Sequence, residues 1–162
     1  MTDTPNPNPP AVRRAAPDDF LRVAALLAEL GRPRLTLDAT DKAQAVYERH
    51  IAEANTASMV AEIDGEIVGF LSLVFRERLN CVHPQAWIPD LIVTEAARGG
   101  GVAKALLQAA SESARAFGCD RVTLESGYAR AVAHQVYGAA GMNNSGYFFE
   151  KALWTKYLPA GC

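Results

Sequence analysis

The spacing of apolar and polar residues in the first third of the chain predicts two amphipathic helices. Asp18 is a suitable N-cap for the first, whose apolar positions follow helical spacing until Gly31 and Pro33 end it. The second is predicted to begin behind Thr40 and to run to about Ala54, again with one apolar face. A helix with one apolar face has to cover another layer of the protein, so both should pack on other elements.

The period then changes to that of strands. Met59 to Ile63 alternates apolar and polar residues, and Asp64-Gly65 is a two-residue hairpin turn. The return strand, Glu66 to Phe75, is almost continuously apolar, which indicates burial on both faces and a central position. After a polar loop, Ala86 to Val93 forms another strand, in which Pro89 cannot donate to a ladder and predicts a local break in the pairing.

The second half of the chain alternates helices and strands. The cluster Gly99-Gly100-Gly101 precedes a helix that ends at Gly118, and a short strand follows from Arg121 to Glu125. A last helix is predicted over Ala129 to Ala140, and the aromatic segment from Gly146 to Trp154 is interpreted as a closing hairpin or long strand. The order βααβββαβαβ predicts an α/β (α+β) fold, a mixed sheet with helices on both faces.

Length and composition fit one globular domain. The chain has 162 residues, of which 49% are apolar and 21% charged, enough to bury a core without disulfides or metals. Residues 1–11 are predicted to form a disordered tail, because proline and asparagine without an apolar run cannot offset the entropy of ordering. Residues 12–158 are predicted to form the domain.

The net charge and the cysteines limit the classes of binding partner and the cellular compartment that the sequence favours. Sixteen basic residues against 18 acidic ones give a net charge of −2, which supplies no general attraction for nucleic acid or an anionic membrane. Three scattered cysteines lack metal-ligand spacing, so we expect no metal site. No secretion signal or membrane-length apolar run is found, which favours a cytoplasmic protein.

The segment from Asp90 to Lys104 carries the most informative chemistry. A strand leads into glycines that open directly into a helix, so unpaired N–H groups and the positive end of the helix dipole converge where side chains are absent. Arg98 and Lys104 add positive charge at the rim, and a pyrophosphate is a natural occupant. The alternative is a flexible connector whose glycines merely permit the turn.

Two nucleotide-binding signatures do not match this loop. A P-loop is excluded because Gly101 is followed by Val102 and Ala103 instead of a lysine and a hydroxyl residue. A dinucleotide fingerprint is weakened because Lys104 stands where the third glycine is required, and residues 12–75 lack the βαβ repetition of a nucleotide-binding oxidoreductase.

Two short motifs resemble those of the GNAT family of N-acetyltransferases. The run Arg98-Gly99-Gly100-Gly101-Val102-Ala103 resembles the family's R/Q-x-x-G-x-G/A signature. The run Arg130-Ala131-Val132-Ala133-His134-Gln135-Val136-Tyr137, with Gly141-Met142, resembles its N/R-x-x-A-x-x-F-Y-x-x-x-G-F helix. Arg130, Val136 and Met142 replace commoner residues there. The segment from Ala86 to Leu153 is similar to the small-molecule branch that includes aminoalkylphosphonate and aminoglycoside acetyltransferases.

The resemblance spans about Val12 to Trp154 and implies a fold and a cofactor site. The implied fold is a mostly antiparallel sheet of six or seven strands with a splayed central strand pair. The implied co-substrate is acetyl-CoA, whose pantetheine lies along the splayed strand. The residues expected to bind it are Leu91, Ile92, Val93, Arg98, Gly99, Gly100, Gly101, Val102, Ala103, Lys104 and Arg130.

The chemistry requires two proton transfers. The acceptor ammonium has to lose a proton and the departing thiolate benefits from gaining one. The resemblance assigns the second transfer to Tyr137, although a packing role for this residue is the alternative. Asp90, beside the splay, is the candidate base, with a purely structural carboxylate as the alternative. Glu125 and Glu62 are weaker candidates, and an acceptor that arrives neutral needs no base.

The sequence therefore predicts an acetyl-CoA-dependent N-acetyltransferase that acts on the primary amine of a small molecule, by direct attack of the amine on the thioester. The alternatives are an enzyme for peptide or protein amines and a non-catalytic acyl-CoA-binding or sensing domain. Family habit suggests a homodimer. Neither a nucleic acid nor a membrane is expected as a partner.

Overall fold

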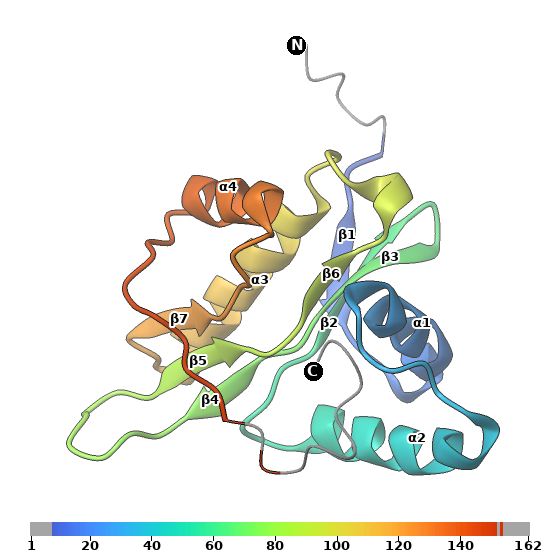
Figure 1. The fold of residues 1–162 in the computed structure, drawn as a ribbon, viewed down its shortest axis with the longest axis horizontal. Coiled ribbons are helices and arrows are strands. Elements are labelled where there is room, and N and C mark those ends of the chain that lie inside the picture. The colour runs from blue at the N-terminus through green and yellow to red at the C-terminus, as the bar shows by residue number, and fades with distance from the viewer. Residues whose placement is uncertain (1–7, 152, 154–162) are drawn as a thin grey trace.

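A computed structural model describes residues 8–151 and 153 of the chain (Figure 1). In that part the helices are α1 (Phe20–Leu30), α2 (Leu37–Ala52), α3 (Val102–Phe117) and α4 (Ala131–Ala139). Its strands are β1 (Ala11–Arg14), β2 (Met59–Ile63), β3 (Glu66–Leu71), β4 (Val74–Arg76), β5 (Gln85–Ile88), β6 (Leu91–Val93) and β7 (Arg121–Leu124). Short 3-10 turns occupy Pro17–Asp19 and Glu95–Ala97.

The strands form two sheets, between which the chain passes three times, from β3 to β4, from β5 to β6 and from β6 through α3 to β7. The first has the order β1-β2-β3-β6 and is antiparallel throughout. The second has the order β4-β5-β7, with β4 antiparallel and β7 parallel to β5. The predicted strand from Glu66 to Phe75 passes from the first sheet to the second with a break at Ser72 and Leu73. The mixed, mostly antiparallel architecture is thus confirmed, with the division into two sheets as an added feature.

Helices cover both faces, as predicted. α1 and α2 bury one face of the first sheet, where Phe20, Leu26 and Tyr47 pack against Phe70 and Ile92. α3 covers the other face and extends over the second sheet through a stripe of buried residues, Val102, Leu106, Leu107, Ala110 and Ala114. Gly69 permits this approach, because a Cβ built on it would lie 3.0 Å from side-chain carbons of Leu106 and Val102. The helix that follows the glycine loop is therefore seated directly on β3.

Several predicted boundaries differ from the observed ones. α2 begins at Leu37 with Thr36 as its extended N-cap, one turn before the predicted start. Thr40 lies inside this helix, where its hydroxyl donates to the Thr36 carbonyl at 2.9 Å. Asp18, the predicted N-cap, lies instead in a 3-10 turn, and Asp19 occupies the N-cap position of α1 without a side-chain capping bond. β1 begins at Ala11, one residue inside the predicted tail.

The predicted closing strand is not formed in the residues that the structure describes. Gly146–Lys151 and Leu153 have no strand pairing, and Tyr147 and Phe149 are exposed, with relative accessibilities of 80% and 87%. Aromatic content alone predicted the strand, but a strand also needs a ladder partner. The end of the predicted element, Trp154, lies outside the described residues.

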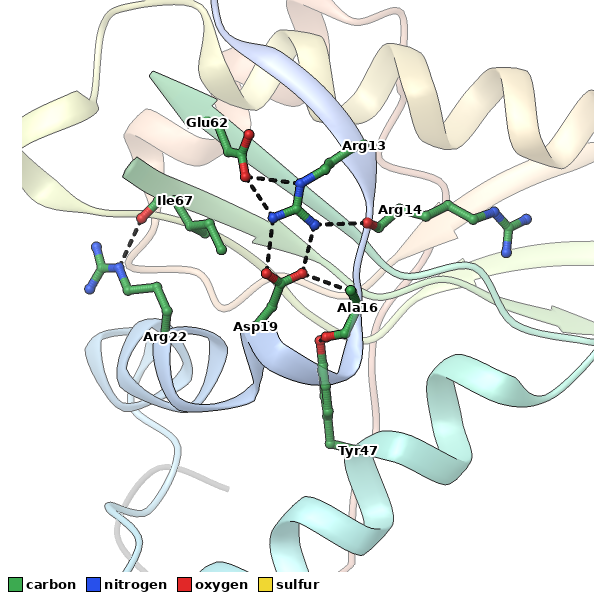
Figure 2. A network of polar contacts seen from close by, with 8 residues as sticks. All are labelled: Arg13, Arg14, Ala16, Asp19, Arg22, Tyr47, Glu62 and Ile67. Atoms are coloured by element: carbon green, nitrogen blue, oxygen red, sulfur yellow. Dashed lines mark hydrogen bonds and ion pairs between the residues drawn. The ribbon is translucent and has the colours of Figure 1, made fainter. Parts of the chain in front are cut away.

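A network of ion pairs ties β1 to the first helix and to β2 (Figure 2). Arg13 Nη1 donates to Asp19 Oδ2 at 2.7 Å, and Nη2 donates to Glu62 Oε1 at 2.6 Å. The hydrogen bond from Arg13 holds the pKa of the Asp19 carboxyl below its ordinary value. Tyr47 donates to the Ala16 carbonyl at 2.8 Å, and burial raises the pKa of its phenol to about 12. The network adds polar contacts between β1, the 3-10 turn and β2 to the apolar packing of Phe20 and Tyr47.

Candidate active site

The strand predicted over Ala86 to Val93 is broken where Pro89 predicted a break. Its first half, β5, belongs to the second sheet and its second half, β6, to the first. At the break Ser72 N–H donates to the Asp90 carbonyl at 3.0 Å, and the Ser72 hydroxyl donates to Asp90 Oδ2 at 2.9 Å. These hydrogen bonds join the segment from β3 to β4 to the segment from β5 to β6, at the point where each segment passes from one sheet to the other.

Beyond this break, β6 has a strand partner on one side only among the residues that the structure describes. It pairs with β3, whereas β7 pairs with β5 over Gln85–Ile88 and diverges from β6 (Figure 1). On the side of β6 that faces β3, Thr94 N–H donates to the Val68 carbonyl, and the Asp90 carbonyl accepts from Ser72 N–H. Backbone groups alternate along an antiparallel strand, so those of Leu91 and Val93 face the open edge. The splayed strand pair expected from the sequence is confirmed.

A cavity of about 150 Å³ lies where the strands part. It is lined by the end of α1, the break, the end of β7, and Arg130 and Tyr137 at the start and in the second half of α4. The lining residues that carry chemistry or shape are Leu91, Leu124, Glu125, Ser126, Arg130 and Tyr137. Residues as far apart in sequence as Leu30 and Tyr137 thus line one small space.

Tyr137 lies in this cavity and is half-buried. Burial raises the pKa of its phenol above the ordinary 10.0, while a hydrogen bond with Ser126 and the charge of Arg130 act in the opposite direction. His134 Nε2 lies 3.1 Å from the Ser126 hydroxyl, so three polar side chains from one strand end and one helix are in contact. The phenol stays protonated at neutral pH and is available as a donor.

Arg130 was expected to contact the cofactor and is found at the wall of the same cavity. It is the N-cap residue of α4, and its Nη2 donates to the Leu30 carbonyl at 3.1 Å. This bond ties the start of α4 to the end of α1. Arg130 lines the cavity together with Tyr137 and is not part of the glycine loop. The motif that begins at Arg130 therefore contributes to the cavity, whereas the motif that begins at Arg98 forms the loop.

The glycine loop has the geometry that an anion requires. Gly99 and Gly101 have φ values of +82° and +80°, and a Cβ at either would meet nothing within 4 Å. Gly101 is the N-cap of α3, so the unpaired N–H groups of the first helical turn open onto free space. Val102 is buried at 1% exposure, and only its backbone can serve a ligand. The residues present therefore fit a pyrophosphate.

The basic residues of the loop behave differently from each other. Arg98 Nε donates to the Val93 carbonyl at 3.1 Å, which places the guanidinium against the open edge of β6. Lys104 is exposed on the first turn of α3. The open edge of β6 runs from Leu91 at the cavity to Val93 beside Arg98. The open edge of β6 is three extended residues long, roughly 10 Å, and it separates the cavity from the glycine loop.

Asp90 is already engaged. Arg32 donates to its Oδ1 from Nε at 3.1 Å and from Nη2 at 2.9 Å, and the Ser72 hydroxyl binds its other oxygen. Both oxygens of the carboxylate thus hold the break together, which favours the structural role over that of a base. No sequence motif marks Arg32, which follows the helix end at Gly31, so its place at the cavity could not be predicted.

The two other carboxylates differ in position. Glu62 accepts hydrogen bonds from Arg13 in the network of Figure 2 and does not line the cavity. Glu125 does line it, and its Oε2 accepts a hydrogen bond from Trp87 Nε1 at 2.6 Å. Among the described residues, no cluster of three or more potential metal ligands is found and no helix is long and apolar enough to cross a membrane.

Comparisons with known proteins agree with this geometry. The model of the Acetyltransferase (GNAT) family matches residues 23–142. The chain is 30% identical over 142 residues to the aminoalkylphosphonate N-acetyltransferase of Salmonella typhimurium, which covers 88% of this chain and 90% of that protein. The chain therefore belongs to the GNAT family of acetyltransferases and is an acyltransferase by family.

Solved structures show the same fold. A putative acetyltransferase from Agrobacterium tumefaciens is 27% identical, with a TM-score of 0.76 over 87% of this chain and 99% of that one. An aminoglycoside N-acetyltransferase solved in complex with CoA is 22% identical, with a TM-score of 0.76 over 93% of this chain and 99% of that one. The second likeness supports the fold alone.

Proposed function

We propose that this protein transfers the acetyl group of acetyl-CoA to the primary amine of a small molecule. The observation that carries the proposal is the one-sided pairing of β6, which leaves an open backbone edge between a glycine-lined helix start and a cavity that contains Tyr137. Family membership supports the reaction class. The name of the Salmonella relative supports a small amine as the acceptor, here an aminoalkylphosphonate or a compound of similar size.

The residues of the path would hold the co-substrate in three places. The N–H groups of Gly99 to Lys104 and the Arg98 guanidinium would bind its diphosphate. The edge groups of Leu91 and Val93 would bind the amide groups of its arm, in the way an added strand binds a sheet edge. When bound, acetyl-CoA supplies an acetyl group activated as a thioester. Arg130, in the wall of the cavity, would contact the end of the arm that carries the acetyl group.

Tyr137 would act as the acid. Its phenol, whose pKa burial raises above 10.0, keeps its proton until charge develops on the departing sulfur. The Ser126 contact fixes the direction of the hydroxyl. Fixed placement of the amine beside the thioester would supply much of the rate, because orientation removes an entropic barrier of about 7–11 kcal/mol at most.

The test is release of free thiol from acetyl-CoA in the presence of a panel of amines. The proposal expects thiol release that depends on a small amine and yields the N-acetyl product. Tight CoA binding without release by any amine would favour a non-catalytic binding domain, and release only with peptides would favour a peptide acceptor. Location in the cytoplasm and assembly as a homodimer stay predictions, which cell fractionation and light scattering would test.

A further inference from the structure

Arg76 of β4 and Trp87 of β5 lie on the face of the second sheet that is turned away from α3. Their strand neighbours Phe75 and Ala86 are buried in the cluster that contains the α3 stripe, and successive side chains of a strand point to opposite faces. Phe75 also stacks on Phe117 of α3, with ring centres 4.0 Å apart. The two side chains are therefore on the far side of the sheet from the helix that the glycine loop begins.

The Arg76 side chain leans along this face toward the cavity that holds Tyr137. In the ladder Arg76 is paired with Gln85, which precedes Trp87 by two residues, roughly 7 Å along the strand. The Arg76 guanidinium carbon nevertheless lies 3.4 Å from the centre of the Trp87 ring. Trp87 Nε1 in turn donates at 2.6 Å to Oε2 of Glu125, which lines the cavity. The width of one indole ring thus separates the guanidinium from the cavity wall.

The Arg76 guanidinium is held in place but is not neutralised. At 3.4 Å from the ring centre, the guanidinium lies flat on the indole, so its N–H donors point sideways, away from the ring. Among the described residues no hydrogen-bond acceptor and no carboxylate partner engages these donors. Arginines elsewhere in the described part do pair with carboxylates, namely Arg13, Arg32, Arg78 and Arg121. Arg76 therefore offers a fixed positive fork to a ligand.

We infer that Arg76 binds an acidic group carried by the amine substrate, a phosphonate or a carboxylate, and that Trp87 is a positioning residue for Arg76. This inference rests on the proposed function and names the acceptor class, a short amine with an acidic group at its other end. Two parallel N–H groups of a guanidinium match two anionic oxygens. Because the glycine loop begins α3, the co-substrate would approach from that side and leave the opposite face to the acceptor.

Two other arginines line the cavity itself, and each is engaged by the protein. Arg32 donates to Oδ1 of Asp90 at 2.9 Å, and Arg130 donates to the Leu30 carbonyl at 3.1 Å. The proposed function also assigns Arg130 to the co-substrate. Arg76 is the better candidate for the acceptor because its fork is held only through its flat face. Since one indole ring separates it from the cavity, the acid and the amine have to be joined by a short chain.

The experiment compares wild type with Arg76→Gln, Arg76→Lys and the control Arg115→Gln, which removes an exposed arginine from the last turn of α3. Thiol release from saturating acetyl-CoA is measured at neutral pH with 2-aminoethylphosphonate, β-alanine and propylamine, which is of similar length and has no acidic group. Wild type should prefer at least one acidic amine. Arg76→Gln should lower kcat/KM for that amine by about 10–100-fold, mainly through KM, and change propylamine by about twofold at most, because the guanidinium touches no reacting atom.

The choice between amines separates substrate binding from a structural role, because a damaged fold would lower the rate with every amine. Arg76→Lys keeps the charge without the fork and should lose about threefold to tenfold with the acidic amine. Arg115→Gln should match wild type with all the amines. An Arg76→Gln variant that keeps the wild-type preference, or a wild type that prefers neither acidic amine to propylamine, would overturn the inference.

Titration calorimetry of the CoA-bound protein tests the inference separately from turnover. Wild type should bind 2-aminoethylphosphonate or β-alanine, and Arg76→Gln should bind the same compound about 10–100-fold more weakly. Binding that depends on Arg76 without thiol release from any amine would refute the proposed function and support the inference. Equal affinity of wild type and Arg76→Gln, or no binding of either compound to wild type, would overturn the inference.

Discussion

Replacing Gly101 with glutamate tests the assignment of the glycine loop. Gly101 has a φ of +80°, where an L residue costs roughly 1–2 kcal/mol, and a Cβ there would meet no atom within 4 Å. No clash with the protein adds to this strain. A carboxylate at this position would oppose a diphosphate, and each pair of like charges about 4 Å apart costs about 1–4 kcal/mol between the dielectric of water and that of a protein surface.

The expected loss in acetyl-CoA binding is about 3 kcal/mol, or about 10²-fold in Kd. Isothermal titration calorimetry measures it directly. Because the repulsion between exposed charges is screened by salt, the difference in Kd between Gly101→Glu and Gly101→Ala should shrink as ionic strength rises. The alanine variant carries the strain without the charge and isolates the electrostatic part.

Gly118→Glu is the matched control. Gly118 has a φ of +91° and equally open surroundings, but it caps the opposite end of the same helix. This variant adds the same side chain with the same backbone strain and should bind acetyl-CoA like wild type, although its thermal stability falls. A Gly101→Glu variant with wild-type affinity, or a Gly118→Glu variant that binds as weakly, would refute the reasoning.

Three further changes test the chemistry and the fold. Tyr137→Phe should lower kcat by about 10²-fold with little change in acetyl-CoA Kd. Because burial raises the pKa of the Tyr137 phenol, wild type is expected to lose activity only in strongly alkaline solution, and steady-state rates of Tyr137→Phe should lack that decline. Asp19→Asn should destabilise the fold by about 1–3 kcal/mol in urea unfolding at neutral pH. Because Arg13 depresses the Asp19 pKa from 3.8, that stability is present above this pH and is lost as the pH falls through the folded-state value, so the two proteins should converge in acid, and a constant gap would contradict the pairing. Gly69→Ala should push against Val102, cost about 1–3 kcal/mol and weaken acetyl-CoA binding, whereas wild-type melting temperature and Kd would show that α3 gives way freely.

Most helices and strands could be predicted from the sequence, because their position depends on the periodicity and the turn residues of the segment itself. Helical spacing, Gly31 and Gly118 located α1 and α3, and Pro89 located the break that divides β5 from β6. The misplaced start of α2 arose because a threonine inside a helix can satisfy its own hydroxyl, which no pattern reveals. The aromatic segment near the C-terminus failed as a strand because pairing depends on a distant partner.

In the site, too, the residues within short motifs could be predicted, whereas the contacts between residues distant in sequence could not. Motif residues such as Gly101 and Tyr137 were predicted from the resemblance, and the structure places them at the two ends of the open edge. The engagement of Asp90 by Arg32 joins residues 58 positions apart, and the bond from Trp87 to Glu125 joins residues 38 apart. Such contacts depend on how the sheets meet, so sequence reasoning could name the carboxylates but not choose between them.

Amide hydrogen exchange of β6 tests the central claim most directly. Leu91 and Val93 present their N–H groups to the open edge, whereas Ile92 faces β3. Saturating acetyl-CoA should slow exchange at Leu91 and Val93 by about tenfold or more and leave Ile92 nearly unchanged, because an added strand protects only the amides it binds. Unaltered exchange at Leu91 and Val93 in the fully bound protein would contradict the account.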